Sequence, residues 1–156
     1  MWILRAIMLL ALVIWIGGII FFSFVTAPVL FTTLPSTRMA GDVVSVVLGR
    51  LHAIGLIAGV VFLVCSIAYN RMLYAQLRLI SATHVLLVLM LVMTAISRFS
   101  ITAQMRDLRN SPGALESSAA RDRFNSLHVW STRLEGGTLF LGLVAVVMTA
   151  RRNPGS

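Results

Sequence analysis

Long apolar segments alternate along the chain with segments in which polar side chains recur every three or four residues. The apolar segments cover residues 6–27, 51–70, 79–97 and 131–150. Each is close to the length that a helix needs to cross a hydrocarbon core of ~30 Å. The pattern therefore predicts an all-α fold, an integral membrane bundle of four helices.

Polar side chains lead into the second and fourth apolar segments, over residues 37–50 and 118–130. Steps of three or four residues place side chains on one face of a helix. One such face carries Arg38, Asp42, Ser45, Gly49 and His52, and the other carries Arg121, Asn125, His128, Thr132 and Glu135. A similar stripe follows the third apolar segment, so helices 2, 3 and 4 should extend beyond one membrane face.

Proline and serine positions predict where helices begin and end. Pro28 lacks an N–H and restricts the residue before it, which predicts a kink or an end of the first helix there. Residues 29–34 would then form a short re-entrant or interfacial piece. Ser36, and either Ser117 or Ser118, are expected to cap the helices that follow them. Glycines expected at helix–helix contacts are Gly17, Gly18, Gly55, Gly59, Gly136 and Gly137.

Composition supports a membrane protein of one domain. Of the 156 residues, 58% are hydrophobic and only 12% are charged, well below the level of soluble domains. The 13 basic residues against 5 acidic ones give a net charge of +8. Because they lie at the ends of the apolar segments, they predict contact with membrane lipids and not with nucleic acid. The single Cys65 excludes an internal disulfide.

Three stretches resemble the transmembrane protein 205-like family of small four-helix membrane proteins, many of them bacterial and labelled as a domain of unknown function. They are WIGGIIFFSFVTAPVLFTTLP, AGDVVSVVLGRLH and FNSLHVWS, and they share the elements W-x-G-G, A-P-x-x-F and F-x-x-L-H-x-x-S. The family commonly has Asn four residues after the last Ser, where this chain has Glu135. The resemblance implies a fold and a place in the bacterial cytoplasmic membrane, but no reaction.

The W-x-G-G element is also shared, more distantly, with the copper-resistance D-type membrane family. That family usually has a His about two helical turns before the Trp. Met8 stands at that place in this chain, and the first apolar segment contains no His. The residues therefore disfavour a copper site.

Histidines supply the candidate cofactor ligands. His52 and His128 each lie where a polar stripe enters the membrane, and two histidines at one depth on facing helices suit haem b. A metal held by both, with Glu135 or Asp42 as oxygen donor, is a further hypothesis. The alternative is that both histidines form hydrogen bonds that hold helix ends together. His84 lies near the other membrane face, where a neighbouring hydroxyl or carbonyl, or else a haem or chlorin pigment, would engage it.

Glu135 has two interpretations. It could handle protons or cations in a transporter, as carboxylates inside membranes often do. It could instead pair with Arg50 or Arg98, which end neighbouring apolar segments, just as Arg38 and Asp42 can pair one helical turn apart. The second interpretation gives a predicted polar clasp, made of Arg38, Asp42, Arg50, His52, Arg98, His128, Ser131 and Glu135.

Motifs for catalysis are missing from the sequence: it has no phosphate-binding loop, no H-E-x-x-H and no supported Ser-His-acid arrangement. We expect a non-enzymatic membrane protein, an accessory or structural subunit of a larger membrane complex, with other membrane subunits as partners and no required cofactor. The alternatives are an electron carrier that binds haem b or a metal through His52 and His128, and a small exporter. Four spans place both termini on one side, which the arginine distribution suggests is cytoplasmic.

Overall fold

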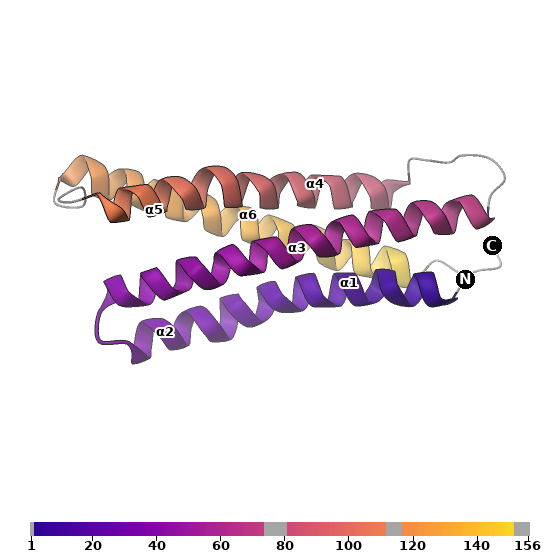
Figure 1. Ribbon diagram of the computed structural model, residues 1–156, viewed down its shortest axis with the longest axis horizontal. Coiled ribbons are helices and arrows are strands. Elements are labelled where there is room, and N and C mark those ends of the chain that lie inside the picture. Colours follow the sequence, from indigo (N-terminus) through magenta and orange to yellow (C-terminus); the bar gives the residue numbers. More distant parts are fainter. Residues whose placement is uncertain (1, 74–80, 112–116, 152–156) are drawn as a thin grey trace.

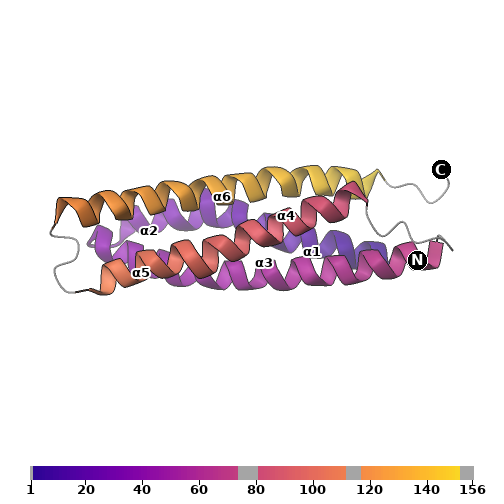
Figure 2. The same cartoon turned by 90° about the horizontal axis from the view of Figure 1, so that it is seen from above.

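The computed structural model describes residues 2–73, 81–111 and 117–151, and shows four long helices side by side (Figures 1 and 2). All four are long and apolar enough to cross a membrane. Three of them also contain charged segments at one end. The predicted all-α membrane bundle is confirmed, and the chain is a multi-pass membrane protein by the length and composition of its helices.

The first helix consists of α1 (Trp2–Phe21), the π-helical segment η1 (Phe22–Thr26) and α2 (Ala27–Thr33). Of the predicted kink or end at Pro28, the end is wrong, and so is the separate piece over 29–34, because the chain stays helical to Thr33. Pro28 stands at the start of α2, directly after the π-helical segment. A wider turn removes the need for the N–H that proline lacks and relieves its clash with the preceding turn.

The other three helices run through the polar lead-ins without interruption. They are α3 (Thr37–Leu73); α4 (Ala82–Ile96) with the π-helical η2 (Ser97–Thr102) and α5 (Ala103–Asn110); and α6 (Ser118–Ala150). The predicted caps are confirmed, since the hydroxyl oxygens of Ser36 and Ser117 accept from the backbone N–H groups of Met39 and Ala120, each at 3.2 Å. The sequence also predicts a short turn that begins at Asn70-Arg71 and a helix stop over residues 110–113. In the structure α3 continues to Leu73 and α5 ends at Asn110, and residues 74–80 and 112–116 lie outside the described residues.

Glycines allow helices to approach closely in the middle of the bundle. A Cβ on Gly55 would lie 2.3 Å from the indole nitrogen of the buried Trp15, and one on Gly142 would lie 1.9 Å from Ile16. Of the glycines expected at contacts, Gly18, Gly55, Gly59 and Gly137 face neighbouring side chains, whereas a Cβ on Gly17 or Gly136 would meet open space. Close backbone approach therefore joins α1 to α3 and to α6 in particular.

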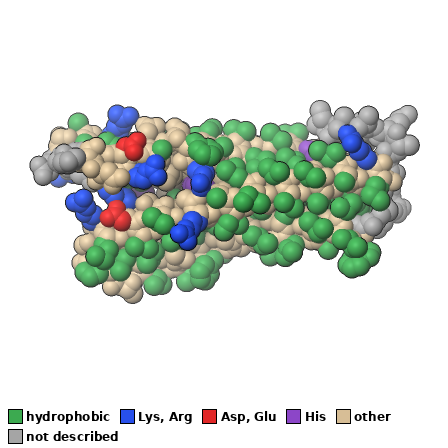
Figure 3. Space-filling view, in the orientation of Figure 1, with side chains coloured by type: hydrophobic (Ala, Val, Ile, Leu, Met, Phe, Trp, Pro, Cys, Tyr) green, Lys and Arg blue, Asp and Glu red, His purple; other side chains and the backbone are tan. Residues whose placement is uncertain are grey.

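The two ends of the bundle differ in character. At the terminal end, where α1 begins and α6 ends, Arg5 donates to the carbonyl of Ala150 at 2.6 Å. At the opposite end, called here the extended end, α2 and α5 finish and α6 begins (Figure 1). Figure 3 shows that arginine side chains gather toward the extended end, while hydrophobic side chains cover the rest of the visible face and also α2. The start of α1 and the end of α6 lie at the same end of the bundle.

Candidate functional site

A histidine and a carboxylate meet between two membrane helices. The ring nitrogen Nε2 of His52, on α3, forms a hydrogen bond with Oε1 of Glu135, on α6. The His52 side chain is only 2% exposed and that of Glu135 is 15% exposed. The other ring nitrogen of His52, Nδ1, is buried with no hydrogen-bond partner among the described residues. Burial makes this pair costly to separate, since each group would lose its partner away from water.

Arg98 reaches the same turn of α3 from η2. One of its guanidinium nitrogens, Nη1, donates to the carbonyl of Gly49, three residues before His52. The π-helical segment η2 contacts both α3 and α6, and its first residue, Ser97, is fully buried. Local widening of a helix changes the direction in which side chains point, and π-helical turns are common at functional sites. We call His52, Glu135, Arg98 and the Gly49 carbonyl the inner polar layer.

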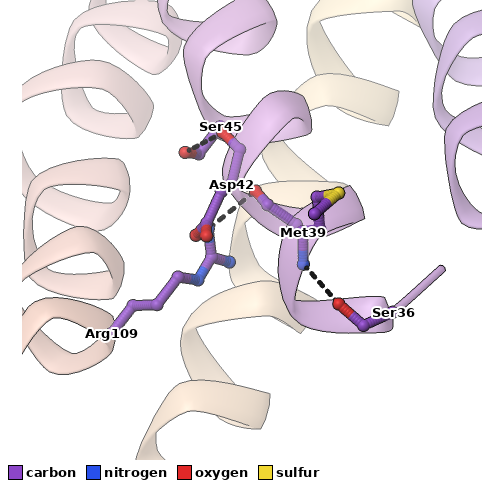
Figure 4. A network of polar contacts seen from close by, with 6 residues as sticks. Ser36, Met39, Asp42, Ser45 and Arg109 are labelled. Carbon is purple, nitrogen blue, oxygen red and sulfur yellow. Dashed lines mark hydrogen bonds and ion pairs between the residues drawn. The ribbon is translucent and has the colours of Figure 1, made fainter. Parts of the chain in front are cut away.

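A second set of contacts lies nearer the extended end. Arg109, on α5, donates through Nη1 to the Gly41 carbonyl at 2.6 Å and to Oδ1 of Asp42 at 3.2 Å (Figure 4). Its guanidinium also lies 5.3 Å from the ring centre of Phe124, on α6. A Cβ on Gly41 would lie 3.0 Å from Nη2 of Arg109, so the missing side chain makes room for the guanidinium.

A further hydrogen bond joins α5 and α6 at this level. Arg123 donates to the side-chain oxygen of Gln104 at 3.1 Å. We call Asp42, Arg109, Arg123 and Gln104, with the Gly41 carbonyl, the outer polar layer. It connects α3, α5 and α6, and the inner polar layer connects α3, η2 and α6. The same three of the four helices are therefore joined at two heights.

The structure changes two of the predicted partners. Asp42 pairs with Arg109 from another helix and not with Arg38 one turn away. Glu135 pairs with His52 and not with Arg50 or Arg98. The spacing of polar residues along one helix places them on a common face, but the alignment between helices decides which side chains meet. Arg109 was missing from the predicted clasp, although it continues the one-sided arginine stripe after the third apolar segment. The glycine beside Asp42 was the available signal for a bulky partner.

The remaining predicted site residues lie apart from the His52–Glu135 contact or beside it. His128 is exposed and stands two helical turns before Glu135 on α6, whereas Ser131, one turn before Glu135, is buried. His84 lies at the start of α4, near the terminal end. There Ser81 and His84 form a capping box, with the Ser81 hydroxyl 2.7 Å from Nδ1 of His84. This hydroxyl comes from the N-cap of the same helix, not from a neighbouring helix.

The free ring nitrogens decide which of the predicted cofactors the site could hold. Haem held by His52 and His128 needs one free ring nitrogen on each, but Nε2 of His52 is engaged by Glu135 and its Nδ1 is buried. His128 points to the exposed surface. Among the described residues, no group of three or more His, Cys, Asp or Glu side chains is placed to hold a metal ion. The geometry as it stands does not fit haem between these two histidines.

Comparison with known protein families identifies the family of this chain. Residues 10–112 match the family described as "Domain of unknown function (DUF4149)", and the protein belongs to this family. The matched part includes His52, Arg98 and Arg109, whereas Glu135 lies beyond it, on α6. No curated protein and no solved structure matches the chain. The description of the family assigns it no function.

Proposed function

We propose that the protein is a non-enzymatic accessory subunit of a larger membrane complex, and that α2 is the segment through which it contacts its partner. The observation that supports this is an apolar helix end where the three other helices are charged. None of the residues of α2 is buried, and hydrophobic side chains on it and on η1 are exposed. These side chains are Phe24, Val25, Val29 and Phe31.

The height of α2 follows from contacts with α3. Gly18, on α1, lies so close to Leu51 that a Cβ would be 2.6 Å from it. Arg50 precedes Leu51, and Asp42 and Arg38 follow further toward the extended end. From Gly18 the first helix continues to Thr33, a distance of about 20 Å along the helix axis. The apolar surface of α2 therefore lies beside the charged segments, where lipid hydrocarbon should not reach.

An exposed apolar surface outside the hydrocarbon favours a protein contact. Contiguous apolar patches on soluble surfaces commonly mark interaction sites. Four polar side chains of the neighbouring helices, Asp42, Arg109, Gln104 and Arg123, take part in hydrogen bonds between helices, whereas the apolar side chains of α2 are left exposed. The exposed side chains on α2 suit a partner with an apolar helix face of its own. This arrangement supports an accessory role better than a chemical one.

Site-specific crosslinking tests the proposal. A photoreactive amino acid replaces Phe31 in one variant and Val129 in a second, two positions that are both 46% exposed and both on the extended side of Arg50 or Arg133. We expect illumination of native membranes to give a discrete protein adduct at position 31 and none at position 129. After solubilisation in mild detergent, the partner protein should no longer co-purify in stoichiometric amount with Phe31→Ser, whereas it should still co-purify with Val129→Ser. Adducts only with lipid at position 31 would overturn the proposal.

Two other functions compete with this one. An electron carrier would use His52 and His128, and binding would have to release Nε2 of His52 from Glu135. A Soret band in the 350 to 700 nm range that is lost in His128→Ala would favour it.

A small exporter would use Glu135, whose carboxylate contacts a buried histidine between two membrane helices. Unchanged transport phenotypes in Glu135→Gln would remove that hypothesis.

We also infer the cellular setting from the sequence resemblance and the charges. The motifs shared with the transmembrane protein 205-like family support a bacterial cytoplasmic membrane. The basic side chains Arg5, Arg71 and Arg151 stand close to apolar segments at the terminal end, with no acidic residue beside them. This supports an orientation with the terminal end in the cytoplasm. Labelling of cysteines introduced at either end of α6, with a membrane-impermeant reagent, tests the orientation.

A further inference from the structure

The first helix and α6 touch within the membrane part of the bundle and separate toward the extended end. Gly142, on α6, lies so close to Ile16, on α1, that a Cβ would overlap it. Near its start, α6 is instead joined to α5 by the hydrogen bond between Arg123 and Gln104. Figure 1 shows the result: α2 and the start of α6 lie on opposite edges of the extended end.

The side of α6 that meets α1 becomes exposed toward the extended end. His128, Glu135 and Gly142 follow one another at steps of seven residues, which return to nearly the same side of a helix. Arg121 stands one further step of seven toward the extended end. Glu135 is engaged by His52, whereas His128 and Arg121 are exposed. This side of α6 therefore faces an opening where α1 no longer covers it.

The first helix forms the opposite side of this opening. Ser23 stands seven residues after Ile16 and is exposed, so the packing against α6 has ended there. Phe31 stands fifteen residues after Ile16, about four turns when five of the residues are π-helical, and is also exposed. We call the opening between residues 23–33 and residues 121–135 the wedge. Its wall on α2 is apolar, and its wall on α6 is polar and basic.

The charge of the α6 wall favours an acidic occupant. Arg121 forms no ion pair with a described residue, and the adjacent Asp122 points about 100° away around the helix. His128 adds a ring N–H that can donate to a carboxylate. Glu135, at the inner end of the wedge, is already engaged by His52. Carboxylates of a partner would therefore meet donors on this wall and little repulsion.

We propose that the wedge receives an amphipathic helix of the partner subunit, with its apolar side on α2 and acidic side chains against Arg121 and His128. The walls extend along the axis for about 21 Å on α6 and about 15 Å on the first helix. A straight opening of this length suits a helix, which presents an apolar and a charged side at once. This inference rests on the proposed function and adds the shape and the charge of the partner segment.

Photocrosslinking from two neighbouring positions on α6 tests this placement. His128 lies on the side toward the wedge, whereas Val129 points about 100° away around the helix, and both are exposed. With a photoreactive amino acid in native membranes, we expect position 128 to capture the same protein as position 31, and position 129 to capture none. Mass spectrometry of the peptide crosslinked at position 128 should show helical apolar periodicity and Asp or Glu beside the attachment point.

The outcomes separate this inference from the proposed function. An adduct at position 31 with none at position 128 would overturn the wedge and keep α2 as the contact segment. Absence of a protein adduct at both positions would overturn the two together. Equal capture at positions 128 and 129, adducts only with lipid at position 128, or an attached peptide without acidic residues would each contradict the wedge alone.

Removal of one charge tests the acidic side of the partner helix. Arg121 and Arg106, on α5, are both exposed, and Arg106 lies outside the wedge. At low salt, we expect Arg121→Gln to lower the amount of the captured partner that stays bound in mild detergent by about threefold, the effect of one partly exposed ion pair. High salt should abolish the difference. Arg121→Lys, which keeps the charge, and Arg106→Gln should retain the partner. Equal losses in Arg121→Gln and Arg106→Gln, or no loss in either, would overturn the acidic assignment.

Discussion

The two polar layers at the extended end join the same helices in different surroundings. In the inner layer, His52 and Glu135 meet with side chains that are 2% and 15% exposed. In the outer layer, Arg109 and Asp42 meet at 3.2 Å with side chains that are 12% and 55% exposed. Both contacts pair an acid with a base across two helices. They differ in how far water can replace a lost partner.

This difference in exposure should set the energy of each contact. A buried polar group that loses its partner keeps its desolvation cost, whereas an exposed one is rehydrated. Exposed ion pairs therefore contribute little, and salt screens them. The inner layer should hold the bundle together, and the outer layer should mainly order the charged segments. Substitutions in the two layers measure this contrast directly.

Glu135→Ala should have the largest effect. It leaves Nε2 of His52 buried without a partner and opens a gap between α3 and α6. We expect the free energy of unfolding to fall by about 3 kcal/mol. A titration with sodium dodecyl sulfate in mixed micelles measures this value, with fluorescence of the buried Trp15 as one reporter.

Glu135→Gln serves as the control for this prediction. Its side-chain oxygen can still accept from His52, so the loss should be clearly smaller than for alanine. If alanine and glutamine cost the same, the hydrogen bond does not carry the stability of the inner layer. If neither variant changes the unfolding midpoint, the two layers do not differ as proposed.

The four helices and the starts of two of them could be predicted from the sequence, whereas the partners across helices could not. Apolar length and the caps at Ser36 and Ser117 are local properties, and the structure confirms them. Asp42 pairs with Arg109 and Glu135 pairs with His52 because of the way α3, α5 and α6 are aligned. No short-range pattern in a single sequence encodes that alignment. Pro28 misled the prediction because a π-helical turn can carry a proline within a continuous helix.

Arg109→Ala should have an intermediate effect. It removes the hydrogen bonds to Gly41 and Asp42 and the contact with Phe124, all at a largely buried guanidinium. We expect the free energy of unfolding to fall by about 2 kcal/mol, since the hydrogen bond to the partly buried Gly41 carbonyl is also lost. Hydrogen exchange should show the loss in α5 and the first turns of α6, with the inner layer still protected. Loss of protection throughout the bundle would contradict the division into two layers.

Arg106→Ala is the matched control for this variant. Arg106 stands one turn before Arg109 on α5 and is exposed. Its removal changes the net charge by the same amount, so any effect of total charge appears equally in both variants. We expect hydrogen exchange in α5 to stay close to that of the unsubstituted protein.

Asp42→Asn should have the smallest effect, because the carboxylate is more than half exposed and the Gly41 carbonyl still accepts from Arg109. We expect a loss of about 0.5 kcal/mol at low salt, and a smaller one at high salt, where the ion pair is screened. The same titration at two salt concentrations measures it. The salt dependence identifies the contact, since the neutral amide can keep a hydrogen bond but not the charge. A loss as large as that of Glu135→Ala would mean that the outer layer is as dry as the inner one, and the contrast in burial would no longer explain the difference between them.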